Sequence, residues 1–165
     1  MESRKTFRDR IAVLVAAVVL TLTGAVSAEI VNFPDANLEQ AVRDMLHIPS
    51  PTPITDTDMA GLECLLCGPA VGDLSGLESA SNLWSLWVSD NGVSDLSPIA
   101  GLSSLLDVNV TNCQIQELPE NLAWGGIVDL NLNGNLISDI RPLASLSGIP
   151  YLINLNDNQS ATSQP

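Results

Sequence analysis

The feature that most constrains the fold is a pattern of apolar residues that returns every 22 residues. Its clearest copy is residues 83–104, LWSLWVSDNGVSDLSPIAGLSS. Copies that begin at Leu105 and Ile127 keep the apolar positions, a partial copy contains Ile153, and a degenerate copy begins near Cys64. A repeat of about 20 to 29 residues with the consensus L-x-x-L-x-L-x-x-N/C-x-L is the signature of a leucine-rich repeat.

Each copy predicts one coil of a solenoid. In Leu86-x-Val88 two apolar side chains alternate with other residues, so both point to the same side of a short strand. One coil cannot bury that side alone, whereas stacked coils share an apolar column and pair strand with strand. The pattern therefore predicts an α/β solenoid. We expect a leucine-rich repeat horseshoe segment of four to five coils over residues 61–158, with parallel strands on its concave face.

A small or polar residue after each predicted strand indicates a ladder of hydrogen bonds along the solenoid. Asn suits this position because its amide both donates and accepts. Cysteine fits the same position by size but bonds weakly. The predicted structural ladder consists of Asn91, Cys113, Asn135 and Asn158.

The degenerate first copy holds two of the three cysteines. The repeat spacing predicts that Cys64 and Leu66 point inward, whereas Glu63, Leu65 and Cys67 lie on the outward face. In a regular strand, residues three apart lie on opposite faces and roughly 10 Å from each other. That separation is too large for a Cys64–Cys67 disulfide. A zinc site would need a second pair of ligands, so we predict no metal site.

Residues 1–28 are predicted to be a secretory signal peptide. Basic residues stand at its start, residues 11–22 are apolar but for Thr21, and Val26-Ser27-Ala28 offers small residues for cleavage after Ala28. The alternative is an uncleaved anchor, for which the apolar run is short against a span of about 20 residues. We therefore expect a protein that is secreted or held in the cell envelope. It would contact a membrane only through the signal segment, if that segment is uncleaved.

The charge of the chain excludes several classes of partner. The whole chain carries 19 acidic and 6 basic residues, a net charge of −13. Loss of the signal removes Glu2, Asp9 and four bases, which leaves 17 acids, Arg43 and Arg141, hence −15. Such a surface repels phosphate backbones and anionic membranes, so nucleic acid is not an expected partner. Basic partners or divalent cations would be attracted, although solubility alone also accounts for the charge.

Residues 29–60 are predicted to form a helical N-terminal cap. Apolar residues over 37–46 have helical spacing, and Asp35 is a suitable N-cap. A second cap and short helix are expected within residues 54–62, starting at Asp56 or Thr57. Because an end coil exposes its apolar edge, this amphipathic stretch is placed to act as a lid. Residues 159–165 are polar and are predicted to be a disordered tail.

These residues carry a resemblance to a known family. Phe33-Pro34-Asp35 in the cap, with the repeated pattern Asn-x-Val/Ile-x-Asp-Leu/Ile-x-Pro-Ile/Leu over residues 91–99 and 135–143, resembles bacterial leucine-rich repeat proteins of the internalin kind. The resemblance covers nearly all of residues 33–158. It implies an exported protein whose repeats bind another macromolecule and which has no catalytic activity. It does not supply the partner, which differs among members of that family.

The third copy departs from this pattern. Asn121 replaces an apolar residue of the repeat and Trp124 replaces a leucine. We expect a looser turn there, held by a larger apolar anchor.

Outward-facing strand side chains are the predicted binding residues. Trp87 is the one large aromatic among them, suited to anchor a protein or to stack on a sugar ring. The alternative is a solvated sheet on which Trp87 shares a pocket with Trp84. Calcium between Asp107, Asp129 and Asn131 lacks the spacing of a known motif. The predicted binding residues on the concave face are Ser85, Trp87, Ser89, Asp107, Asn109, Thr111, Asp129, Asn131, Asn133, Asn154 and Asn156.

The sequence predicts a binding module and not an enzyme. His47 stands alone, and no serine has the context of a nucleophile. No cofactor is predicted. The expected partner is a protein or an envelope glycan. The alternative is a truncated or structural solenoid that belongs to a longer surface protein, or that self-associates through its C-terminal open edge.

Overall fold

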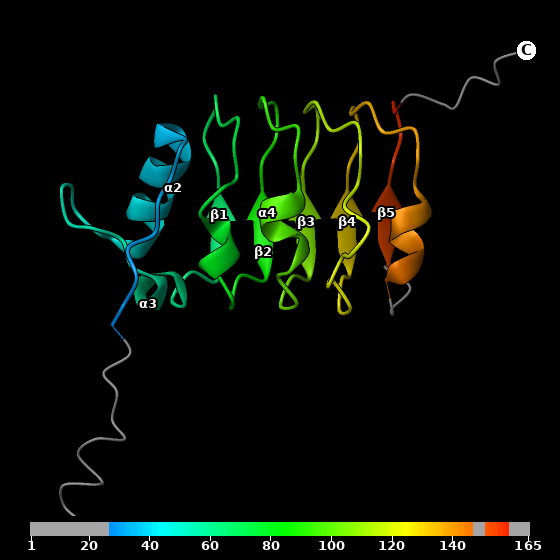
Figure 1. The fold of residues 1–165 in the computed structure, drawn as a ribbon. Helices are drawn as coiled ribbons and strands as arrows, with labels where there is room; N and C mark the ends of the chain where they lie inside the picture. The colour runs from blue at the N-terminus through cyan, green and yellow to red at the C-terminus, as the bar shows by residue number, and fades with distance from the viewer. Residues whose placement is uncertain (1–26, 147–150, 159–165) are drawn as a thin grey trace, which may run out of the picture.

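The computed structural model describes residues 27–146 and 151–158, so nearly all of the predicted signal segment and the tail lie outside the described residues. Its centre is one parallel sheet whose strands follow chain order. Figure 1 shows these strands side by side along the solenoid. The strands are β1 (Cys64–Leu66), β2 (Ser85–Trp87), β3 (Asp107–Asn109), β4 (Asp129–Asn131) and β5 (Leu152–Asn154). The predicted leucine-rich repeat solenoid is confirmed, with five parallel strands in the described part of the chain.

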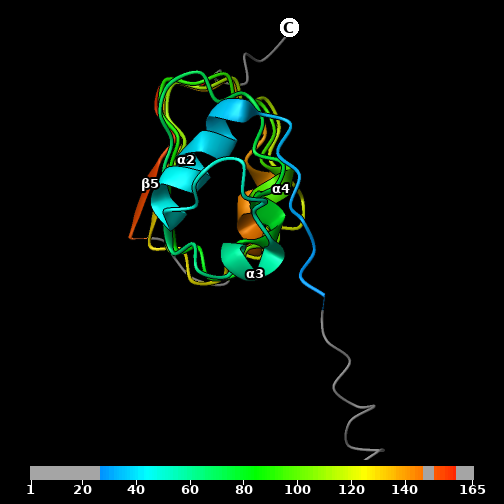
Figure 2. The ribbon, with the colours of Figure 1, turned by 90° about the vertical axis from the view of Figure 1, so that its left-hand side faces the viewer.

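Short helical turns close the coils on the side opposite the sheet, as Figure 2 shows along the solenoid axis. They are η1 (Leu77–Ser79), α4 (Ser97–Ala100) and η2 (Arg141–Ser145). Between β3 and β4 the described chain has no helix, as the departure of the third copy predicts. Trp124 is fully buried there, and its indole N–H donates to the Ile99 carbonyl at 2.9 Å. The large anchor thus replaces the helical turn.

One apolar core runs through all the coils. Leu86, Val108 and Leu130 are register partners at the strand centres, and each is fully buried. The column ends at β5, where the corresponding Ile153 is 42% exposed because no further coil covers it among the described residues.

The N-terminal cap covers the first coil. Helix α2 (Ala36–Leu46) begins after Asp35, whose side chain accepts from the N–H groups of Asn37 and Leu38. Its buried Leu38 and Val42 belong to the continuous core. Helix α3 (Asp56–Met59) has Thr55 as its N-cap, one residue before the earliest expected cap, because Thr55 and Asp58 form a reciprocal capping box.

Asp35 also ties the cap to the solenoid. Its second carboxylate oxygen accepts from the N–H groups of Gly72 at 2.7 Å and Asp73 at 3.3 Å. Burial acts to raise the pKa of Asp35, but these donors, with those of Leu38 and Asn37, outweigh it and hold the pKa below its usual value. The charged form of Asp35 therefore favours docking of the cap.

Asn91, Asn135 and Asn158 occupy the positions of the predicted ladder. The Asn135 side chain donates to the carbonyls of Val110 and Leu132 and accepts from the Ile115 N–H. Asn158 makes the equivalent bonds one coil later, to the carbonyls of Leu132 and Leu155 and from the Ile137 N–H. Asn91 donates to the carbonyls of Gly68 and Ser89 and accepts from the Val71 N–H. At Cys113 the thiol donates to the Val88 carbonyl at 3.4 Å, a weaker bond than the amide makes.

The predicted register of the first coil is wrong by one residue. Leu65, and not Leu66, is the register partner of Leu86, so Leu65 is buried and Leu66 faces outward. Cys67 is likewise buried, whereas Cys64 is half-buried on the outward side. The run Cys64-Leu65-Leu66-Cys67 is apolar on both sides of the strand, so alternation alone cannot select the register.

The described residues contain no helix long and apolar enough to cross a lipid bilayer.

Candidate functional site

The candidate site is the strand face, defined as the outward side chains of β1–β5 and of the residues that directly follow them. The parallel register aligns these side chains in rows along the solenoid. One row is Cys64, Ser85, Asp107, Asp129 and Leu152, the next is Leu66, Trp87, Asn109, Asn131 and Asn154, and Ser89, Thr111, Asn133 and Asn156 follow their strands. Neighbours in a row lie about 4.8 Å apart.

Trp87 is the aromatic centre of the strand face. Its indole N–H donates to Asp107 Oδ2 at 2.8 Å, while its side chain remains 46% exposed. The same oxygen accepts from the Ser85 hydroxyl at 3.0 Å, and Ser85 itself is buried. Asp107 therefore holds the indole in one orientation with part of its surface open to a partner. Ser85, expected as a contact residue, serves instead to position Asp107.

The polar rows are organised by bonds within the face. Ser89 donates to Asn109 at 3.3 Å and accepts from the Thr111 hydroxyl at 2.9 Å. Asn131 and Asn154 each accept from the backbone N–H two residues ahead, which fixes their amides at the strand ends. These contacts limit side-chain motion, so the ordering entropy lost on binding a partner is reduced.

An apolar groove extends the strand face toward the cap. It lies between α2 and the end of β1, has a volume of about 540 Å³, and is lined by Met45 of the helix and Leu66 of the strand. Both side chains are exposed, and Leu66 is the register partner of Trp87. Sequence reasoning missed this groove because it placed Leu66 in the core, and because Met45 comes from a distant segment.

The strand face has acidic groups and no cation to balance them in the described chain. Asp107 and Asp129 are register partners on adjacent strands. Arg43 binds Glu39 and the Thr52 carbonyl, and Arg141 binds Asp139, whose pKa it lowers to about 2 by hydrogen bonding. No cluster that could hold a metal ion is present among the described residues. The balancing charge must come from solvent ions or a partner.

The buried cysteines offer no nucleophile. Burial, with the nearby Asp35 carboxylate, raises the pKa of the Cys67 thiol to about 12. Burial also raises the pKa of Cys113. Both therefore remain neutral thiols near neutral pH. Because the thiolate is the reactive form, neither is a nucleophile there.

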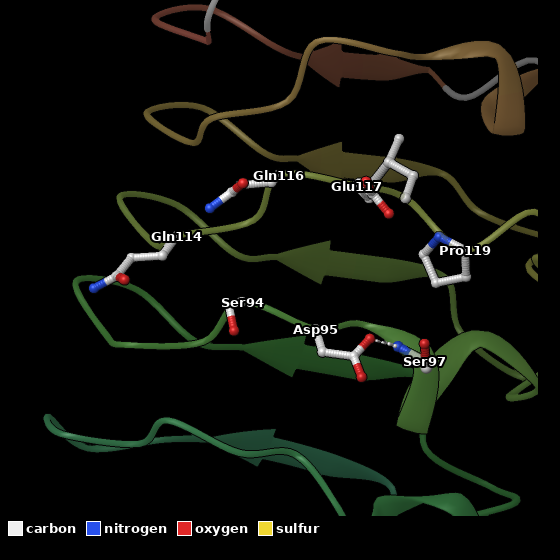
Figure 3. Close-up of a pocket in the computed structure, with 8 residues that line it drawn as sticks. Ser94, Asp95, Ser97, Gln114, Gln116, Glu117 and Pro119 are labelled. Atoms are coloured by element: carbon white, nitrogen blue, oxygen red, sulfur yellow. Dashed lines mark hydrogen bonds between the residues drawn. The ribbon is translucent and has the colours of Figure 1, made fainter.

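A second hollow lies on the opposite side of the solenoid, where the third coil lacks its helix. Figure 3 shows its polar lining, with Asp95 accepting from the Ser97 N–H at 2.8 Å. The volume is about 390 Å³, and the remaining polar side chains of the lining come from Ser94, Gln114, Gln116 and Glu117. The Asp95 carboxylate already accepts a hydrogen bond in the turn that starts α4. We therefore attribute the hollow to the absence of a helix in the third coil.

Comparison with known proteins agrees with this architecture. No family model matches the chain. An internalin of Listeria monocytogenes (InlF) superposes with a TM-score of 0.67 and 30% sequence identity, covering 74% of this chain and 37% of that one. A rat protein, leucine-rich repeat and IQ domain-containing protein 3, is 28% identical over 85 residues, which is 50% of this chain and 13% of the rat protein. The chain thus spans little more than a third of the internalin it matches.

The stacked coils, the parallel sheet and the asparagine positions define a leucine-rich repeat solenoid. Within that class this is an internalin-like leucine-rich repeat protein. Domains of this kind are generally protein-interaction modules and typically lack catalysis.

Proposed function

We propose that this chain is an exported module, secreted or held at the cell surface, that binds another protein through its strand face and performs no catalysis. The observation that carries the proposal is Trp87, held by Asp107 yet nearly half exposed beside the exposed Leu66. A fixed aromatic with an open surface loses little entropy on binding, and tryptophan is enriched among residues that dominate interface energy. An envelope glycan stays the second candidate ligand, since the same ring could stack on a sugar.

Selection against a random library tests this proposal. The exported protein is immobilised and panned with displayed peptides and with an array of bacterial envelope glycans, and the selected ligands are titrated by calorimetry. We expect Trp87→Ala to weaken peptide binding about tenfold or more, as for an interface anchor. The matched control, Leu136→Ala, removes an exposed apolar side chain away from the strands and should change affinity by less than about twofold. Ligands indifferent to Trp87→Ala would refute the proposed site.

Export itself needs a separate measurement. The full chain is produced with its leader in a bacterial host, and the N-terminus of the protein recovered outside the cytoplasm is determined by mass spectrometry. Cleavage after Ala28 predicts a protein that begins at Glu29. Recovery of an uncleaved, membrane-bound chain would support the anchor instead, and an intact cytoplasmic chain would contradict export.

Exposed apolar side chains at β5 favour a second candidate role, assembly. Among the described residues, Leu152 and Ile153 of β5 and Ile140 before η2 are exposed. An uncovered strand edge can pair with another chain. Light scattering over a concentration series separates the roles: a constant monomer mass leaves ligand binding as the function, whereas growing mass that Ile153→Lys abolishes would support assembly.

A further inference from the structure

A row of exposed apolar side chains runs beside the strand face. Trp84, Leu106, Val128 and Tyr151 each directly precede a strand, and their side chains are 42%, 40%, 48% and 96% exposed. Main-chain bonds align them, because Leu106 N–H donates to the Trp84 carbonyl at 2.9 Å, and the same bond recurs from Val128 and Tyr151. We call these four residues the apolar ridge.

The apolar ridge is not explained by the fold. Before Trp84, Leu106 and Val128 the preceding residues already fill the core, and the ridge side chains remain outside it. Those buried residues are Leu83, Leu105 and Ile127. A single exposed apolar residue is ordinary, but a contiguous row on a strongly acidic protein indicates an interaction surface.

Two acidic side chains, here called the acidic row, lie along the apolar ridge, one residue further into β3 and β4. Asp107 and Asp129 are neighbours there, and Glu63 stands at the start of the ridge, where its carbonyl accepts from the Trp84 N–H. Among the described residues no hydrogen bond or ion pair reaches the Asp129 carboxylate. Like charges on adjacent strands repel, so a cation supplied from outside would relieve this repulsion.

The spacing favours a helical occupant. The apolar ridge covers three strand intervals, about 14 Å at about 4.8 Å each. About ten residues of α-helix span that length, and one helical turn rises about 5.4 Å. An amphipathic helix laid along the ridge therefore offers one apolar side chain to each coil, while its flank passes over the acidic row.

We propose that the partner segment is a cationic amphipathic helix, which rests its apolar side chains on Trp84, Leu106 and Val128 and directs Lys or Arg side chains to Asp107 and Asp129. This inference rests on the proposed function and names the partner's chemistry. A second copy of the chain is a poor occupant because it would bring another acidic face, and the negative charge disfavours an anionic lipid surface.

The probe is a synthetic helical peptide of leucine and lysine, about 15 residues long so that it spans the ridge. It is titrated into the exported protein while backbone NMR shifts are recorded. Two reference peptides have the same composition in scrambled order and the same pattern with glutamate for lysine. We expect binding of the patterned cationic peptide alone, with shifts centred on the apolar ridge and β3–β4.

Two double variants separate the apolar and ionic contributions. Leu106→Ser with Val128→Ser, and Asp107→Asn with Asp129→Asn, should each weaken the probe about tenfold or more. Their matched controls are Leu136→Ser and Glu117→Gln, exposed side chains away from the ridge, for which we expect less than about twofold change. Circular dichroism establishes that each variant is folded before titration.

Equal binding of the scrambled peptide, or indifference to both double variants, would overturn the inference, because attraction would then be generic to an acidic protein. That failure is distinguishable from failure of the proposed function. If selected ligands still depend on Trp87 while the cationic helix does not bind, the strand face remains the binding site and only the cationic, helical identity of the partner is lost.

Discussion

At the scale of single residues, the asparagine ladder shows how many backbone hydrogen bonds one side chain can supply. Asn135 is 2% exposed and hydrogen-bonds to four backbone groups belonging to two coils. Asn135→Ala would remove the side-chain partner of the Ile115 N–H and of the Val110 carbonyl, whereas the Leu132 carbonyl would still accept from Asn158. We therefore expect a loss of about 3 kcal/mol in the free energy of unfolding. Urea denaturation measures it.

Cys113 provides the internal comparison. Its thiol bonds weakly in the same position, so Cys113→Ala should cost less than Asn135→Ala, about 1 to 2 kcal/mol. Cys113→Asn should raise stability by completing the ladder. Equal losses in the two alanine variants would show that the amide bonds are not what stabilises the coils.

Asp35 makes cap docking sensitive to acid. Because its folded-state pKa is lowered, its contribution to stability is fully present above the unfolded pKa and is lost as pH falls through the folded pKa. Asp58, whose pKa is lowered by hydrogen bonds from Thr55, acts in the same direction. We expect Asp35→Asn to be less stable than the wild type at pH 7, and the gap to narrow toward pH 3. Urea titrations at both pH values measure it; a gap that stays constant would contradict this role.

At the scale of elements, the third coil replaces a helical turn with a side chain. Trp124 fills the core and gives the Ile99 carbonyl its donor. Although leucine is the residue that the repeat prefers there, Trp124→Leu would open a cavity and remove that donor. We expect a loss of about 2 to 4 kcal/mol in thermal or urea unfolding. Trp84→Leu, on the exposed ridge, should change stability by less than about 1 kcal/mol. Similar losses in the two variants would contradict the anchoring role.

At the scale of the whole molecule, the repeat period predicted the solenoid, the strand order and the outward rows of β2–β5, because each coil restates the same alternation. The first coil escaped prediction. Leu65 and Leu66 are equally apolar, so their positions depend on how the cap packs and not on local pattern. The groove between Met45 and Leu66 escaped for the same reason. The residues of the apolar ridge recur at the same position of each repeat in the sequence. Only their exposed fractions in the structure distinguish them from the buried apolar residues of the core.

The length of the solenoid limits the area that is available for binding a partner. The strand face spans five coils, about 24 Å at about 4.8 Å each, and its flat area falls below the roughly 800 Å² per partner of a standard interface. The binding free energy must therefore come from few side chains, and we expect Trp87, Leu66 and the apolar ridge to contribute most of it.

The most direct test of the strand face is site-specific photo-crosslinking in cells that produce the protein. Trp87 is replaced by p-benzoylphenylalanine in one variant and Leu136 in another, and cross-linked products are compared after irradiation. We expect a discrete adduct with a second protein from position 87 and none from position 136. An adduct from position 136 alone would place the partner on another surface and contradict binding through the strand face.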